Sequence, residues 1–344
     1  MTGKPVRLAI VGLDHWYSAF SLADAAAQHP GAELVAISDA DEGRARQLAE
    51  RVGVERTTAR HEELIEDAEI GVIASFVSVD QNPGVCTAAA RAGKHLLSVK
   101  PLALDHEGAT EILQAVREAG VVFLPAESRG RAAAGNQQLK AWVDERKFGR
   151  LLTASYSLWS GLPKSWPDNP DSGWFIDPAR APGGGWIDHS IYQIDLLRWL
   201  LGDEVREVSG RMANLKYPDL AFEDYGTATI TFQGGLIATI EDTWLCPPTG
   251  GRTSWALVGT EGAAAFDALS AKLSLAGDFA PFTGWVHTAP QSPFTEGLDH
   301  LLALVRGEVE PVATVEDAWR NLAVCRAFYD AARSGGSVTP RALP

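Results

Sequence analysis

Cysteine is scarce in this chain, and the few cysteines present lie far apart. Of 344 residues only Cys86, Cys246 and Cys325 are cysteine, and no Cys-x-x-Cys pair occurs. An odd, scattered set excludes a disulfide framework and lacks the paired spacing of a structural zinc site. We therefore expect no metal site, and a reducing compartment, the cytoplasm, for this protein.

Basic residues and long apolar runs are also lacking. Lys and Arg number 30 against 44 Asp and Glu, which gives a formal net charge of −14 at pH 7. An acidic chain repels the phosphates of nucleic acids and the surfaces of anionic membranes. No segment approaches the about 20 apolar residues that a membrane-spanning helix requires. These absences exclude nucleic acid and membrane as partners and favour a small molecule.

Apolar residues are abundant, and they follow a regular order. They make up 46% of the chain, enough for two sizeable cores. Up to about Glu127, continuous apolar runs typical of buried parallel strands alternate with helical patterns. Repeated βα units of this kind predict an α/β Rossmann domain, with a doubly wound parallel sheet, in residues 1–127.

The pattern changes after this point. A stretch rich in Pro, Gly and Trp spans 161–185, a helix closed by Gly202 follows it, and alternating apolar and polar residues then predict antiparallel strands. The segment 233–235, Gln-Gly-Gly, is typical of a hairpin turn. Two helical stretches end the chain. We predict that residues 128–344 form an α+β domain with a large, mainly antiparallel open sheet.

The turn after the first predicted strand is a candidate cofactor site. Of the three glycines of a Rossmann turn only Gly12 is present, and it is followed by Leu13, Asp14 and His15. The bare turn also fits a strand-to-helix connection without a cofactor, and a lone His15 also fits a structural role. The Asp14 carboxylate disfavours a nearby pyrophosphate unless it turns away or is neutralised.

An acid at the end of the second predicted strand supports the cofactor reading. Asp39 lies roughly 20 residues past the turn, where a carboxylate hydrogen-bonds the hydroxyls of the adenosine ribose. No Arg is adjacent to hold a 2′-phosphate, which favours NAD over NADP. The alternative is that Asp39 caps the next helix.

Three further segments resemble the Gfo/Idh/MocA family of NAD(P)-dependent sugar and polyol oxidoreductases over essentially the whole chain. In "AARAGKHLLSVKPLAL", Lys100 and Pro101 match a Glu-Lys-Pro motif, with Val99 in place of the Glu. "GGGWIDHSIYQIDLLRWLLG" is similar to the family's glycine-rich loop and catalytic helix, and "VEDAWRNLAVCRAFYDAARSGG" to its last helix. The resemblance implies the two-domain fold already predicted, and dimers or tetramers formed through the exposed face of the second-domain sheet.

The resemblance also implies roles for particular residues. The catalytic helix usually reads Asp-x-x-x-His-x-x-Asp; Asp188 and Asp195 match it, and Tyr192 stands at the His position. The counterparts of a loop beside the nicotinamide ribose are Ser75 and Asn82, in a segment that looks longer here.

Helical geometry places Asp188, Tyr192 and Asp195 on one stripe, since a helix turns about 100° per residue. Oxidation of an alcohol requires a base for the hydroxyl proton. Tyr192 serves if the Lys100 cation lowers its pKa from about 10, with Asp188 orienting the group. The rival base is His189, whose ordinary pKa is about 6.5. Asp195 also fits a purely structural role.

The glycines before this helix admit close approach of a ligand to the backbone, and the N–H groups at the helix start would favour a developing oxyanion. Aromatic faces suit the apolar face of a pyranose, so we expect Trp159, Trp174 and Trp186 to contact substrate, with Arg180 binding a hydroxyl. The alternative for each Trp is a role in covering the sheet or in an interface.

The sequence therefore predicts an NAD-dependent oxidoreductase that transfers hydride between a hydroxyl of a sugar or cyclic polyol and nicotinamide. Two alternatives remain open. One is an NAD-dependent glycoside-cleaving enzyme that oxidises its sugar transiently and eliminates the aglycone. The other is a ligand-sensing regulator without activity on the same fold, against which the presence of Lys100 counts.

Overall fold

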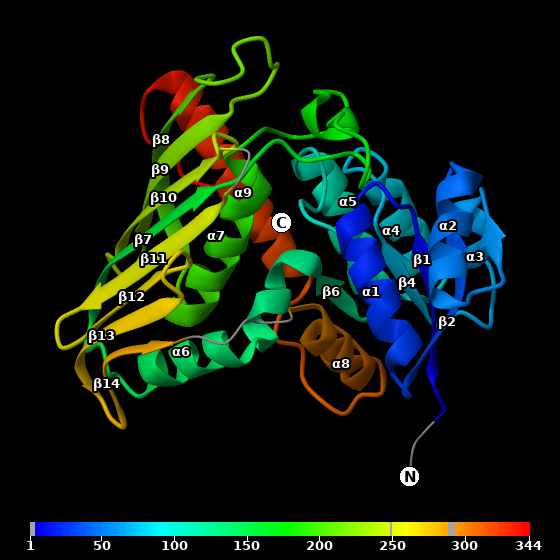
Figure 1. The fold of residues 1–344 in the computed structure, drawn as a ribbon, viewed down its shortest axis with the longest axis horizontal. Helices are drawn as coiled ribbons and strands as arrows, with labels where there is room; N and C mark the ends of the chain where they lie inside the picture. The colour runs from blue at the N-terminus through cyan, green and yellow to red at the C-terminus, as the bar shows by residue number, and fades with distance from the viewer. Residues whose placement is uncertain (1–3, 248–249, 288–292) are drawn as a thin grey trace.

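The computed structural model describes residues 4–247, 250–287 and 293–344. Two sheets stand side by side with helices between them (Figure 1). The predicted fold class is confirmed: a Rossmann sheet is followed by a larger, mainly antiparallel sheet.

The first sheet is wholly parallel and has the strand order β3-β2-β1-β4-β5-β6. The order reverses between β1 and β4, and in sheets of this topology the crevice at the carboxyl ends of these two strands is where ligands bind. The strands are β1 (Val6–Val11), β2 (Ala32–Ser38), β3 (Thr57–Thr58), β4 (Val72–Ser75), β5 (His95–Ser98) and β6 (Phe123–Pro125).

Five helices accompany this sheet: α1 (Trp16–Gln28), α2 (Glu42–Val52), α3 (His61–Ile65), α4 (Asn82–Arg91) and α5 (His106–Ala119). Their ends follow local chemistry. Asp41 caps the start of α2 through its carboxylate, and Gly53, with φ of 77°, ends the helix. The sequence did not predict β3 or α3. They contain only two and five residues, too few to show the hydrophobic period of a strand or a helix.

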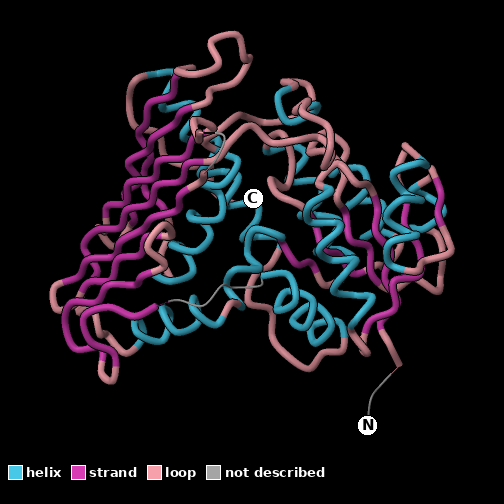
Figure 2. The backbone as a smooth tube through the Cα atoms, viewed as in Figure 1, coloured by secondary structure: helices cyan, strands magenta, loops and turns pink. Residues whose placement is uncertain are grey.

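The second sheet has the order β14-β13-β12-β11-β7-β10-β9-β8, and only β7 and β10 pair in parallel among its described strands. Within the described chain all helices lie on its inner face, and the outer face is open (Figure 2). The predicted hairpin joins β9 to β10. The strands are β7 (Leu151–Trp159), β8 (Val205–Ala213), β9 (Tyr225–Phe232), β10 (Ile237–Thr243), β11 (Arg252–Gly259), β12 (Ala263–Asp267), β13 (Lys272–Phe279) and β14 (Phe282–His287).

The remaining helices link the two halves: 3₁₀ helices η1 (Ala126–Ala132) and η2 (Gly173–Ile176), and α6 (Ala134–Asp144), α7 (Ile187–Leu201), α8 (Pro293–Val305) and α9 (Val315–Ser334). The last two return to the first domain. Leu301 of α8 joins the core around β1, and Trp319 of α9 joins the core beside α5, whereas Phe328 packs in the second domain. The division at residue 127 therefore separates the sheets but not the cores.

Candidate active site

The turn after β1 is shaped by Gly12. Its φ is 77°, and a Cβ there would collide with the side chain and backbone of Val77, in the loop after β4. Only glycine fits a position with both constraints. The turn therefore lies directly against the β4 loop, at the crevice where the strand order reverses.

The Asp14 carboxylate is bound to the loop after β4 and faces a cation. Its carboxylate accepts a hydrogen bond from the backbone N–H of Ser78 (2.8 Å) and lies 3.5 Å from the guanidinium of Arg180. Helix α1 then begins at Trp16 with no capping side chain and no acid in its first turn, whereas Asp41 and Asp105 cap α2 and α5. An uncapped helix start of this kind suits an anionic pyrophosphate.

Asp39 ends β2 beside the turn and is not the cap of α2. One carboxylate oxygen accepts from the backbone N–H of Leu13 (2.7 Å) and the other from that of Asp41 (2.9 Å). Each oxygen keeps a second lone pair that can accept from a ribose hydroxyl. The Asp39 acceptor oxygens, the uncapped start of α1 and the close-packed Gly12 all fit a dinucleotide.

His15 is buried behind the turn. Its Nδ1 lies 3.1 Å from the carbonyl oxygen of Val77, and its ring packs on Trp174. Burial, and to a smaller degree the Lys100 cation, lowers the pKa of His15 to about 3, so the ring is neutral. The residue holds the turn in place.

The prediction that Ser75 and Asn82 contact the cofactor is wrong. Both side chains are fully buried and bind each other (2.8 Å), and Asn82 also donates to the Ser98 hydroxyl and the Leu102 carbonyl. They form a polar network inside the domain, which leaves them no face toward the crevice. The loop that does lie there is 77–79.

Lys100 and Asp188 form a nearly buried ion pair between the domains. Lys100, which precedes the cis Pro101 after β5, donates through Nζ to the Oδ1 (2.8 Å) and the backbone carbonyl of Asp188. The Trp244 indole N–H donates to the other carboxylate oxygen (3.0 Å). Burial opposes both charges, yet Asp188 raises the pKa of Lys100, and His189 and Lys100 lower that of Asp188. Both groups are therefore charged.

A cavity of about 420 Å³ opens beside this pair. The predicted catalytic residues Lys100, Asp188, His189 and Tyr192 all line it, and the Lys100 ammonium lies 5.3 Å from the centre of the Tyr192 ring. This volume is within the usual range for small-molecule sites. Lys164, which the sequence suggests as a donor to substrate hydroxyls, also lines the cavity. Sequence reasoning missed the other lining residues, which are Trp16, Tyr17, Arg129, Ser160, Gly161, Pro163 and Phe175.

His189 sits against a second acid that the sequence did not reveal. Its backbone N–H donates to Asp242 Oδ2 (2.8 Å), and its Nδ1 lies 3.6 Å from both Asp242 Oδ1 and Asp188 Oδ2. Asp242 is fully buried on β10. No local motif marks it, because the sheet register alone brings β10 under the start of α7.

The glycines before α7 lie closely against other parts of the protein. A Cβ on Gly183 would collide with the Tyr329 hydroxyl, and one on Gly184 with the backbone carbonyl of Glu223. The Glu223 carboxylate also accepts from the backbone N–H groups of Gly184 and Trp186. The backbone N–H of residue 189 donates to another carboxylate, so the N–H groups of residues 184, 186 and 189 are all bound to protein carboxylates.

Two of the predicted substrate-binding tryptophans lie elsewhere. Trp186 is fully buried and stacks on Phe328, with ring centroids 3.7 Å apart, because the core needs a large flat side chain there. Trp159 is exposed on the outer face of the second sheet, next to Arg252. Neither contacts the cavity, so their prediction as substrate contacts is wrong.

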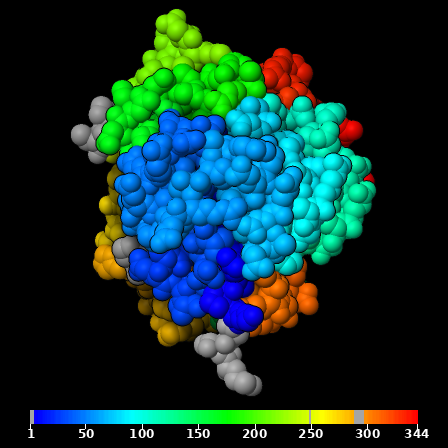
Figure 3. All heavy atoms as spheres, turned by 90° about the vertical axis from the view of Figure 1, so that its right-hand side faces the viewer, coloured from blue at the N-terminus to red at the C-terminus, as the bar shows by residue number. Residues whose placement is uncertain are grey.

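Trp174 and Arg180 lie on the segment between β7 and α7, residues 160–186, which we call the bridging loop. The Trp174 indole donates to the carbonyl of Asp14 (3.2 Å), and Arg180 donates to the Ser78 hydroxyl (2.7 Å). Figure 3 shows this green segment lying against the blue first domain. Both side chains hold the bridging loop to the cofactor turn, and neither lines the 420 Å³ cavity.

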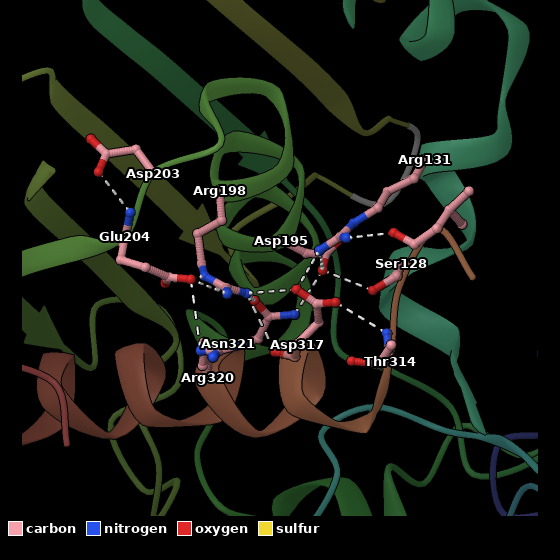
Figure 4. A network of polar contacts seen from close by, with 11 residues as sticks. Ser128, Arg131, Asp195, Arg198, Asp203, Glu204, Thr314, Asp317, Arg320 and Asn321 are labelled. Atoms are coloured by element: carbon pink, nitrogen blue, oxygen red, sulfur yellow. Dashed lines mark hydrogen bonds and ion pairs between the residues drawn. The ribbon is translucent and has the colours of Figure 1, made fainter. Parts of the chain in front are cut away.

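Asp195 belongs to a buried polar network (Figure 4). Its carboxylate accepts from Arg131 (2.6 Å) and Asn321 (2.8 Å), and from the hydroxyl of Ser128 (2.8 Å). Arg131 also reaches Asp317 of α9 (3.2 Å). The predicted stripe on α7 therefore divides: its first turns line the cavity, and Asp195 ties the helix to η1 and α9.

Metal-binding clusters and membrane-spanning helices can be sought only among the residues that the structure describes. No group of three or more His, Cys, Asp or Glu side chains there is arranged to hold a metal ion. No helix in the same part of the chain has the length and apolar character needed to cross a membrane.

The chain is similar to several known proteins along its whole length. Scyllo-inositol 2-dehydrogenase (NAD(+)) of Bacillus subtilis is 28% identical, with 96% of this chain and 95% of that protein covered. Levoglucosan dehydrogenase of Pseudarthrobacter phenanthrenivorans is 26% identical, with 88% and 82% covered. A solved structure of levoglucosan dehydrogenase in complex with NADH superimposes with a TM-score of 0.84 at 22% identity, over 99% of this chain and 100% of that one.

Family models agree with this likeness. Residues 6–127 match the oxidoreductase family with an NAD-binding Rossmann fold, and residues 136–265 match the GFO/IDH/MocA C-terminal domain. The predicted NAD cofactor is confirmed. The chain belongs to the Gfo/Idh/MocA family of oxidoreductases, with an NAD-binding Rossmann domain at its N-terminal end.

Proposed function

We propose that this protein oxidises a hydroxyl group of a sugar or cyclic polyol with NAD. The observation that carries the proposal is the Lys100–Asp188 ion pair in the wall of the cavity, which Tyr192 and His189 also line. Lys100 follows β5 at the carboxyl edge of the sheet, where α/β folds bind their ligands. The inositol and levoglucosan dehydrogenases that resemble this chain support a polyol or sugar as substrate.

The turn after β1 and the residues that line the cavity would have different roles in the reaction. Gly12, Asp39 and the uncapped start of α1 would hold the dinucleotide, which when bound supplies a hydride acceptor. The Lys100 ammonium donates to the substrate oxygen and stabilises the negative charge that develops there. Asp188 holds that ammonium in place. The proton passes to one of two acceptors in the cavity wall, Tyr192 or His189.

A turnover assay tests the proposal. NAD is mixed with the protein and a panel of sugars and cyclic polyols, and reduced cofactor is followed by absorbance. We expect turnover with at least one member, lost in Lys100→Met and kept in the control Lys140→Met, whose lysine is remote from the cavity and pairs with Asp144. Absence of turnover across the panel, or full activity of Lys100→Met, contradicts the proposal. Release of an aglycone without net reduced NAD identifies the glycoside-cleaving alternative.

We further propose that a second copy of the chain covers the outer face of the larger sheet. Four exposed apolar side chains share this face by strand register: Trp159, Ile237, Val258 and Trp285. Exposed apolar groups gathered on one sheet face are typical of an interface. Light scattering on the purified protein should give the mass of a dimer or tetramer, and Trp285→Glu should lower it. A monomeric mass for the unaltered protein contradicts this.

The compartment is a related proposal. All three cysteines are buried free thiols. Together with the use of NAD, this supports a cytoplasmic location.

A further inference from the structure

An imidazole and a buried carboxylate face each other beneath the cavity without completing a hydrogen bond. His189 Nδ1 and Asp242 Oδ1 are 3.6 Å apart. Both atoms are shielded from solvent, and neither has a hydrogen-bond partner among the residues that the structure describes. Buried polar atoms are normally paired, and hydrogen bonds in active sites often tighten only when substrate binds. A small rotation of the ring makes the missing bond.

The rest of the ring is accessible from the cavity. The His189 side chain is 31% exposed and lines the cavity together with Lys100 and Tyr192. Because Nδ1 is shielded, the accessible edge is the one that carries Nε2. A carboxylate behind Nδ1–H fixes the tautomer in which Nε2 bears a free lone pair toward the substrate. The hydrogen bond from the backbone N–H of His189 to Asp242 Oδ2 keeps the Asp242 carboxylate next to the imidazole.

We infer that Asp242 is a positioning residue that makes His189, rather than Tyr192, the proton acceptor of this site. The inference rests on the proposed function. In the reaction the O–H bond of the alcohol breaks and its proton forms a bond to His189 Nε2, while the carbon loses hydride to NAD and the C=O bond forms. The imidazolium afterwards releases the proton to solvent, so the products are the carbonyl compound, NADH and one proton.

Tyr192 is less well placed for this task. The Lys100 ammonium lies 5.3 Å from the centre of the Tyr192 ring, and it already donates to two oxygens of Asp188. A phenol with an ordinary pKa of about 10 is a poor base near neutral pH unless a cation meets its oxygen. His189 needs no such help.

The titratable groups around the imidazole come from four parts of the chain. They are Asp188 and Tyr192 on α7, Asp242 on β10, Lys100 after β5, and Tyr156 on β7, which faces Asp242. Burial and Lys100 lower the pKa of His189, but the two carboxylates outweigh them and raise it. Removal of the Asp242 charge therefore lowers the pKa of His189, and the form that accepts a proton persists to lower pH.

The activity test compares pH profiles of kcat/KM for alcohol oxidation. The unaltered enzyme should lose activity on the acid side as His189 becomes protonated. We call this fall of kcat/KM at low pH the acid limb, and the constant value at higher pH the plateau. Asp242→Asn should move the acid limb to lower pH and reduce the plateau. His189→Gln should reduce the plateau about 100-fold and remove the acid limb. Tyr192→Phe should keep the limb at the pH of the unaltered enzyme. The matched control is Glu241→Gln, a carboxylate one position away on β10 that binds Ser157 on the other face and should not move the limb.

A second readout needs no substrate. The protein is labelled at its histidines, and the ring signal missing from His189→Gln is followed by NMR against pH. We expect a midpoint above the ordinary 6.5, which Asp242→Asn lowers and Glu241→Gln leaves in place. An unmoved midpoint in Asp242→Asn, or an acid limb that survives in His189→Gln but not in Tyr192→Phe, overturns the inference. If no substrate is turned over, the proposed function fails, and the NMR titration still decides whether Asp242 and His189 are coupled.

Discussion

The buried Glu127 carboxyl should make the free energy of unfolding depend on pH. This side chain lies in the first turn of η1 and is 3% exposed, and neither carboxylate oxygen has a hydrogen-bond partner within the described part of the chain. Burial, and then the neighbouring Asp195 carboxylate, raises its pKa from 4.5 to about 8. The folded protein therefore prefers this group protonated.

The sign of the pH dependence follows from proton linkage. Between pH 4.5 and about 8 the folded state binds a proton that the unfolded state has lost, so the stability contributed by the neutral group is complete below pH 4.5 and lost as pH rises to about 8. At about 1.4 kcal/mol for each pH unit between the two pKa values, the full loss is on the order of 5 kcal/mol, of which about 4 kcal/mol falls between pH 5 and 8. Glu127→Gln stays neutral and escapes this loss.

The assay is urea unfolding followed by tryptophan fluorescence at a series of pH values from 5 to 8. Relative to the unaltered protein, Glu127→Gln should gain free energy of unfolding steadily as the pH rises, by on the order of 4 kcal/mol in total. The exposed Glu145 provides the control, since Glu145→Gln should track the unaltered protein throughout. Parallel curves for Glu127→Gln and the unaltered protein would refute the reasoning.

Three other substitutions have expected outcomes of known direction. Asp195→Ala leaves the Arg131 guanidinium without its main buried partner and should lower the free energy of unfolding by about 3–5 kcal/mol in the same urea assay. Gly184→Ala forces a methyl group into backbone and should cost about 1–3 kcal/mol, whereas Gly84→Ala, in α4 with open space around it, should cost nothing. Asp39→Ala removes an acceptor for the ribose and should weaken NADH binding about tenfold or more, measured by fluorescence titration.

The fold was predictable because its elements are long enough to show their periods. The apolar run that becomes β1, the glycine ends of α2 and α7 and the β9–β10 hairpin turn all carry local signals that tertiary contacts did not override. The return of α8 and the first half of α9 to the Rossmann core was not predictable, since an amphipathic pattern shows that a face is buried but not against which sheet.

The site was predictable only where its residues share one short segment or one motif. Lys100, Asp188 and Tyr192 lie where the family motifs place them, and the structure brings them to one cavity. Asp242 and Glu223 were missed because they reach α7 through strand register and chain return, which leave no spacing to read. Residue type also misled, since an indole suits a pyranose and a core equally well.

The role of the glycines before α7 was also not predictable from the sequence. Their number suggested an open floor for a ligand, but the Cβ positions point at Tyr329 and Glu223 inside the second domain. Glycine marks close approach of backbone to some partner, and sequence does not say whether that partner is ligand or protein.

The most direct test of the central claim is the fate of the hydrogen on the alcohol carbon. A sugar or polyol that is turned over is prepared with deuterium at that carbon, and the NADH formed is examined by mass spectrometry. We predict one deuterium in each NADH, formed at a rate that falls sharply in Lys100→Met. Unlabelled NADH, or labelled NADH formed equally fast by Lys100→Met, would contradict the account.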